Sequence, residues 1–144
     1  LPESDRDHKT IWENRYRSIV DSEDHLYRNG TRIIKFFLHL SREEQRQRFI
    51  ERIDNPDKNW KFSLADMEQR KSWDDYMKAY EEMIQETATK HAPWYVVPAD
   101  NKWFTRVIVG SAVIETLASL DLAYPEVDQS KLKELAAAKK KLLS

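Results

Sequence analysis

The sequence has no cysteine and only two glycines, Gly30 and Gly110, among its 144 residues. Without cysteine it forms neither disulfides nor thiolate metal sites, which fits a reducing cytoplasm, where we expect the protein to act. Neither glycine belongs to a GxxxxGK phosphate-binding loop. No apolar run approaches the ~20 residues that a bilayer-spanning helix needs, so we expect no membrane partner. The longest apolar runs lie near residues 33–40 and 107–114.

Neither sign of charge dominates the chain. It holds 24 basic and 25 acidic residues, for a formal net charge of −1. Such a balance argues against general binding to nucleic acid or to a membrane surface, so any basic site must be a local cluster. With 34% charged and 40% hydrophobic residues, the composition fits one polar domain that still has a core.

Two segments have the composition of buried strands. Residues 32–40 read RIIKFFLHL and residues 94–97 read WYVV, both rich in β-branched or aromatic side chains. Continuous runs of this kind are typical of parallel strands that are buried on both faces. We therefore expect two parallel strands, with His39 packed in the core.

Between these strands, residues 41–90 predict two helices. Ser41 followed by Glu44 forms a capping box, and Ser63 followed by Asp66 is a helix start of the same kind. The helix after Ser63 carries apolar residues at i, i+3, i+4 and i+7 spacing, which predicts one buried face. We expect Trp73, Tyr76 and Tyr80 to lie in the core.

Three further helices are expected outside that region. The first begins at a capping box at Thr10 and ends at Asn29-Gly30. The second covers residues 102–120, with Asp100 as its expected N-cap. The third covers residues 131–143 and is charged and amphipathic.

The order strand, helices, strand, helix predicts an α/β fold with parallel strands. Two short strands do not make a stable parallel sheet by themselves, because such sheets need more strands and helices on both faces. We therefore expect further strands on the N-terminal side of residue 1. The absence of an initiator methionine fits a cut or processed end.

Several long, ordered segments resemble the polyphosphate kinase 2 family. They are KFFLHLSREEQRQRFIERIDNPDKNWKFSLAD at residues 35–66, WDDYMKAYEEMI at 73–84 and APWYVVPADNKWF at 92–104, with IWENRYRSI and TLASLDLAYPEV outside them. The resemblance covers about residues 11–127. It implies a P-loop kinase-like α/β fold, a parallel sheet flanked by helices with a helical lid. Residues 1–127 would be the C-terminal half of the catalytic domain, with the lid at about 48–66, and residues 128–144 a charged helical tail.

The resemblance also implies an activity: a phosphotransferase that moves a phosphoryl group between inorganic polyphosphate and AMP or ADP, as a homo-oligomer. The phosphate-binding loop, its lysine and the Mg²⁺ ligands would precede residue 1, so the 144-residue piece alone should be inactive. Two alternatives remain open at this point. One is an ATP-dependent nucleoside monophosphate kinase, and the other is a non-catalytic, polyanion-binding helical module.

The strongest candidate site is a run of cations. Arg48 and Arg52 lie one helical turn apart and lead into a loop with Lys58 and Lys61. Arginine binds phosphate in a bidentate way, whereas lysine acts as a point charge. The spacing alone favours a solvated helix face, in which Glu44 and Arg48 form an ordinary i, i+4 pair. The resemblance favours a lid that binds polyphosphate or the transferring phosphoryl group.

A second candidate follows the second strand. Asp100, Asn101 and Lys102 open a helix at the carboxyl edge of the predicted sheet, where open α/β sheets bind ligands. By the resemblance, this loop would pass near the nucleotide. The alternative for Asp100 is that it only caps the helix. The four histidines lack metal-ligand spacing, so we expect no metal site and no certain catalytic residue within this chain.

Overall fold

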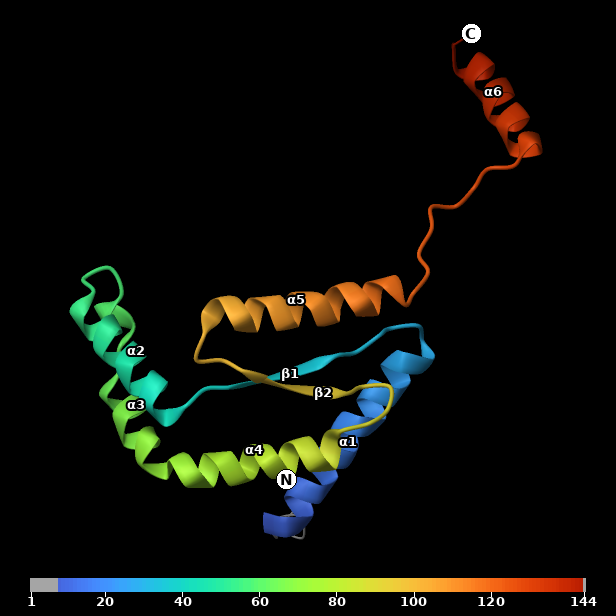
Figure 1. The fold of residues 1–144 in the computed structure, drawn as a ribbon. Coiled ribbons are helices and arrows are strands. Elements are labelled where there is room, and N and C mark those ends of the chain that lie inside the picture. Colours follow the sequence, from blue (N-terminus) through green and yellow to red (C-terminus); the bar gives the residue numbers. More distant parts are fainter. Residues whose placement is uncertain (1–7, 144) are drawn as a thin grey trace. The chain divides into compact units, whose positions relative to one another are not determined.

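The computed structural model describes residues 8–143 (Figure 1). The chain forms two compact units that divide between Val113 and Ile114. The first unit contains the two strands and most of the helices, and it also holds both groups of candidate site residues. Each unit is described by itself below.

The chain begins with helix α1 (His8–Arg28), strand β1 (Lys35–His39) and helix α2 (Arg42–Asp54). The connection from α2 to β2 contains α3 (Leu64–Gln69), α4 (Trp73–Thr87) and the short 3-10 helices η2 (Asn59–Lys61) and η3 (Arg70–Ser72). Strand β2 covers Trp94–Pro98 and is followed by α5 (Lys102–Ala118).

The two strands pair in parallel, as the sequence predicts. Lys35 lies opposite Trp94 and His39 lies opposite Pro98. Figure 1 shows this pair of strands with α4 on one side and the first part of α5 on the other. The fold of the first unit is therefore α/β, built on a two-stranded parallel sheet.

The expectation that the strands are buried on both faces is wrong for this chain. Leu38 is 51% exposed and Val96 is 55% exposed, whereas Val97 is 1% exposed. His39, expected in the core, is also exposed. The reason is that a two-stranded sheet has an outer edge on each strand, and the described helices cover only part of its faces.

Between the strands, the second predicted helix is divided rather than continuous. The 3-10 turn η3 separates α3 from α4. Arg70 in this turn donates from Nη1 to the carbonyl of Arg42 and to Oε1 of Gln45, both at 2.7 Å. These bonds attach the turn to the first residues of α2, which accounts for a change of direction that helical spacing alone does not predict.

The predicted helix starts at the two serines are confirmed. Ser41 Oγ accepts from the Glu44 backbone N–H at 3.1 Å, and Ser63 Oγ accepts from Ala65 at 3.2 Å. Just after the C-terminal end of α1, Gly30 has φ +88°. Its N–H donates to Tyr27 and that of Thr31 donates to Leu26, each at 3.0 Å. This pair of bonds is a Schellman motif, and it ends α1 where the sequence predicts.

A polar cluster joins α1 to the sheet and to α4. Lys35 Nζ lies 2.6 Å from Oε2 of Glu23 and donates to the Thr87 carbonyl at 2.7 Å. The two charged side chains are only 12% and 13% exposed. Trp94 Nε1 donates to Thr87 Oγ1 at 2.9 Å, and the Lys35 ammonium lies 5.2 Å from the Trp94 ring centroid. The ion pair is therefore nearly buried and is supported by further bonds from two elements.

Buried apolar side chains are few among the described residues: Ala92, Val97, Ala99 and Ala112. Tyr76 and Tyr80, expected in the core, are 42% and 38% exposed. With Trp73 they line an open cavity of about 450 Å³ against Phe37 of β1, where the Phe37 and Tyr80 rings lie 4.9 Å apart. The aromatic face of α4 thus does point at the sheet, but described residues cover it only in part.

The second unit contains the end of α5 and helix α6, at Gln129–Leu143, the segment for which a charged helix is predicted. Asp128 caps α6, since its Oδ1 accepts from the Lys131 backbone N–H at 2.7 Å. Within residues 8–143, no helix combines the length and the apolar character needed to cross a membrane.

Candidate functional site

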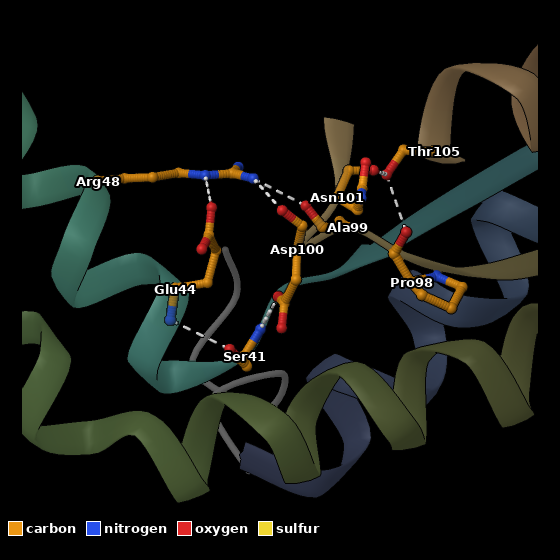
Figure 2. Close-up of polar contacts among 8 residues, drawn as sticks. All are labelled: Ser41, Glu44, Arg48, Pro98, Ala99, Asp100, Asn101 and Thr105. Carbon is orange, nitrogen blue, oxygen red and sulfur yellow. Dashed lines mark hydrogen bonds and ion pairs between the residues drawn. The ribbon is translucent and has the colours of Figure 1, made fainter. Parts of the chain in front are cut away.

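The loop between β2 and α5 is held by hydrogen bonds to its backbone and to the residues on either side of it. Ala99, which is 6% exposed, donates its N–H to the His39 carbonyl at 2.9 Å. Thr105 Oγ1 donates to the carbonyls of Pro98 and Asn101 at 2.8 and 2.9 Å. The loop therefore leaves the sheet in one defined path (Figure 2).

The predicted N-cap of α5 is wrong by one residue. Asn101 is the cap, because its Oδ1 accepts from the Phe104 N–H at 3.4 Å. Its carbonyl also accepts from the Thr105 backbone N–H at 3.0 Å. The Asp100 carboxylate has another partner: its Oδ1 accepts from the Ser41 backbone N–H at 2.7 Å. That N–H is the first donor of α2, 59 residues away in the sequence.

Arg48 reaches the same loop from α2. Its Nε donates to Oε1 of Glu44 at 2.8 Å, so the i, i+4 pair expected from the spacing is present. Its Nη2 donates to the Ala99 carbonyl at 2.8 Å and to that of Asp100 at 3.4 Å. The side chain is 26% exposed. Figure 2 shows the guanidinium lying between Glu44 and the loop, so Arg48 is not a freely solvated cation.

These surroundings lower the pKa of Asp100 below its ordinary value of 3.8. Hydrogen bonds from Ser41, first from its backbone N–H and then from its side chain, are the largest causes, because they stabilise the charged carboxylate. Partial desolvation acts in the opposite direction, and the positive charges of Arg48 and His39 add smaller lowering effects. Asp100 is consequently a carboxylate throughout the neutral range.

The structure combines residues from both predicted sites in one groove. This basic groove is open, measures about 840 Å³, and contains cations from α2, from the loop after it and from the start of α5. Its lining residues are Arg48, Glu51, Arg52, Asp54, Asn55, Pro56, Lys58 and Lys102. The sequence predicted Lys102 only for the nucleotide side, and its position beside the lid cations is a finding of the tertiary structure.

Lys61 is not among the residues that line the basic groove. Its ammonium lies 5.0 Å from the centroid of the Trp60 ring in η2. Arg52 does line the groove, and its guanidinium lies 5.8 Å from the centroid of the Phe49 ring. The four predicted lid cations are thus divided by the fold: Arg48, Arg52 and Lys58 line the groove, and Lys61 lies outside its lining.

Asp100 and Asn101 line a second cavity, of about 350 Å³, at the carboxyl ends of both strands. His39, Ser41 and Phe104 also line it. Sequence reasoning did not include these three. The position of His39 at the carboxyl end of β1 was a usable signal, because ligands of open α/β sheets bind beyond the strand ends. Within residues 8–143, no group of three acidic or histidine side chains is arranged to hold a metal ion.

The family model of polyphosphate kinase 2 matches residues 5–125 of this chain. The chain belongs to the polyphosphate kinase 2 family. A solved structure described as polyphosphate kinase 2 from Arthrobacter aurescens superimposes with a TM-score of 0.80 and 41% identity, over 89% of this chain and 45% of that chain. The α/β arrangement around β1 and β2 is therefore the fold of a polyphosphate kinase 2.

Two curated relatives carry activity names. An ADP-polyphosphate phosphotransferase of Rhodopseudomonas palustris is 52% identical over 99% of this chain and 50% of the relative. An AMP/ADP-polyphosphate phosphotransferase of Meiothermus ruber is 50% identical over 81% of this chain and 43% of the relative. This chain thus spans about half the length of these polyphosphate kinase 2 relatives.

Proposed function

We propose that the complete protein transfers a phosphoryl group between inorganic polyphosphate and AMP or ADP, and that this chain supplies part of the phosphate-binding site. The names of the relatives support the reaction. The observation that carries the assignment of the site is the basic groove, in which Arg52 and Lys58 of the lid lie with Lys102 at the start of α5. A polyanion fits such a surface better than an uncharged substrate does.

The groove cations match what phosphoryl transfer demands of a protein. The reaction depends mostly on positioning and on stabilising charge on the phosphoryl oxygens. Arg52 would bind these oxygens in a bidentate way, while Lys58 and Lys102 would act as point charges along the chain of phosphates. Glu51 and Asp54 also line the groove and keep it from being uniformly positive, which would favour phosphate groups at particular positions.

The nucleotide side of the proposed site is the loop Asp100-Asn101-Lys102 at the carboxyl edge of the sheet. Asn101 and Asp100 line the smaller cavity there, next to His39. Mg²⁺ would neutralise phosphate charge when bound, with ligands outside this segment. Among residues 8–143, no group of three side chains is arranged to hold Mg²⁺, so no step of the proposal relies on a metal ligand from these residues. We also propose a cytoplasmic homo-oligomer.

A donor assay on the full-length protein tests the proposal. AMP and ADP are each incubated with Mg²⁺ and with either polyphosphate or ATP as donor, and the nucleotide products are separated and measured. We expect ADP or ATP to form with polyphosphate. Transfer from ATP to AMP with none from polyphosphate would instead identify a nucleoside monophosphate kinase. Binding of polyphosphate without transfer to either nucleotide would identify a polyanion-binding module.

The basic groove itself is tested by Lys58→Ala. A flexible lysine acts on a polyanion mainly through its charge, so its loss should raise the apparent KM for polyphosphate, and more strongly at low ionic strength. The matched control is Lys139→Ala in α6, which removes the same charge from a residue outside the groove lining. Equal KM values for the two variants at low salt would contradict the placement of polyphosphate in this groove.

A further inference from the structure

The first turn of α2 and the β2–α5 loop are joined by a closed set of hydrogen bonds, which we call the Asp100 cluster (Ser41, Glu44, Arg48, Ala99 and Asp100; Figure 2). Ser41 Oγ accepts from the Glu44 N–H, and the Glu44 carboxylate accepts from Arg48. Arg48 in turn donates to Ala99, and Asp100 accepts from the Ser41 N–H. The bonds that cross the junction are donated by α2 or its cap residue Ser41 and accepted by the loop.

The capping box at Ser41 is incomplete in a way that creates this junction. In a complete box, the Glu44 side chain would return to the Ser41 N–H. Here Glu44 binds Arg48 instead, and the Asp100 carboxylate takes the Ser41 N–H from outside the helix. A carboxylate that accepts from a backbone N–H makes a charge-assisted bond, roughly twice as strong as a neutral one.

Packing alone does not determine where α2 lies. None of its residues is fully buried. Its polar bonds to other elements are those of the Asp100 cluster and the bonds from Arg70 of η3 to Arg42 and Gln45. Of these, only the bonds of the Asp100 cluster join α2 to the loop that leads into Lys102.

We propose that Asp100 is a positioning residue, which holds the first turn of α2 against the β2–α5 loop so that cations from both elements face one groove. The groove depends on this junction because Arg52 lies one turn beyond Arg48 on α2, and Lys102, the first residue of α5, lies two residues beyond Asp100. This inference rests on the proposed function, since it assigns the junction a role in binding the phosphate chain.

The proposal differs from the prediction that Asp100 contacts the nucleotide. A direct contact between Asp100 and the nucleotide would change the KM for the nucleotide, and it would not require the bond from the Ser41 N–H to Asp100. A positioning role acts on polyphosphate and on turnover, because groups displaced by about 1 Å can lose on the order of 10²-fold in rate. It needs an acceptor oxygen at residue 100, which asparagine also supplies, with a weaker bond than the carboxylate makes.

The experiment compares three variants of the full-length protein. Asp100→Ala removes the acceptor, and Asp100→Asn retains an oxygen at the same place without the charge. Asp57→Ala is the matched control: Asp57 is an exposed carboxylate in the loop after α2, outside the groove lining, and its contact with Trp60 uses its backbone carbonyl. The readouts are amide hydrogen exchange at Ser41 and steady-state kinetics with polyphosphate and nucleotide varied separately.

We expect Asp100→Ala to speed exchange at Ser41 by about tenfold or more, since its N–H loses its partner. The same variant should lower kcat/KM for polyphosphate by about tenfold, whereas Asp100→Asn should stay within about threefold of the unchanged protein. Asp57→Ala should leave Ser41 exchange unchanged and should not weaken use of polyphosphate, because it removes a negative charge near a polyanion site.

Two results would overturn the positioning role. One is an unchanged rate of exchange at Ser41 in Asp100→Ala. The other is an equal rise in nucleotide KM in Asp100→Ala and Asp100→Asn, with polyphosphate kinetics unchanged, which indicates direct contact with the nucleotide. A complete lack of polyphosphate-dependent transfer by the unchanged protein overturns the proposed function separately, because Ser41 exchange is measured without any substrate.

Discussion

Arg48 and Arg52 lie one turn apart on α2, and the sequence predicts both as phosphate-binding cations of one lid. Their guanidinium groups nevertheless have different surroundings. Arg48 donates to the carbonyl of Ala99, a buried residue, and to Glu44. Arg52 lies beside the Phe49 ring and lines the basic groove. We therefore expect Arg48 to act mainly on stability and Arg52 mainly on the reaction.

Arg52→Ala in the full-length protein should lower turnover by at least about tenfold, equivalent to about 1.4 kcal/mol in activation free energy. Its free energy of unfolding should change by less than about 1 kcal/mol, because a single cation–π contact that is only partly buried contributes little. Arg48→Ala should lower the free energy of unfolding by about 1–2 kcal/mol, since it leaves a carbonyl and a carboxylate without their donor. Denaturant titration and kcat measurements separate the two, with Lys139→Ala as the neutral control.

The pKa of Asp100 gives a second test at the residue scale. We expect a ¹³C NMR titration of its carboxyl carbon to yield a pKa below 3.8, because Ser41 donates to the charged form. Because the folded pKa of Asp100 is lowered, its carboxylate stabilises the fold at pH values above its unfolded pKa. This contribution to the free energy of unfolding is lost as pH falls through the folded pKa. A pKa at or above 3.8 would show that the Ser41 bond is absent in solution.

At the scale of elements, both strands and three of the predicted helix ends follow local rules. Ser41 and Ser63 cap their helices through hydroxyl groups, and Gly30 ends α1 with a positive φ. What local rules do not predict is how the elements attach to one another. The nearly buried Lys35–Glu23 pair, for instance, joins α1 to β1 and also reaches the end of α4 through Thr87.

Lys35→Met should lower the free energy of unfolding by about 3 kcal/mol, because it leaves the Glu23 carboxylate nearly buried without its partner. The control is Lys71→Met, which breaks an ion pair with Glu68 whose side chains are 72% and 69% exposed. Exposed pairs contribute at most about 1 kcal/mol, so the control should change stability little. Equal urea midpoints for the two variants would show that the Lys35 pair does not stabilise the fold.

At the scale of the whole molecule, many of the described apolar side chains are exposed to solvent. Trp103, Ile114 and Leu117 on α5 are 65%, 69% and 52% exposed, and β1 and β2 form a sheet of only two strands. Sheets of parallel strands are ordinarily covered on both faces. The chain also spans about half of its relatives' length.

The 144-residue chain by itself should therefore form no ATP from ADP and polyphosphate. Its glycines, Gly30 and Gly110, do not belong to a GxxxxGK loop, and the proposed transfer would need the backbone and lysine of such a loop to hold the phosphates. The assay uses the purified chain beside the full-length protein at equal concentration. Measurable ATP from the chain alone would show that its own residues suffice for catalysis.

The sequence by itself determined the parallel strands, the serine caps, the end of α1 and the family. These features depend on side chains that are close together in the chain or on long ordered segments, so local pattern and resemblance are enough to predict them. Tertiary structure decided the exposure of His39, the break at η3, the partner of Asp100 and the bond from Arg48 to Ala99. The physical reason is distance along the chain: the bonds from Ser41 to Asp100 and from Arg48 to Ala99 join residues 59 and 51 positions apart. No periodicity encodes such a contact, because it forms only when the parallel pairing of β1 and β2 brings the two strand ends to the same edge of the sheet.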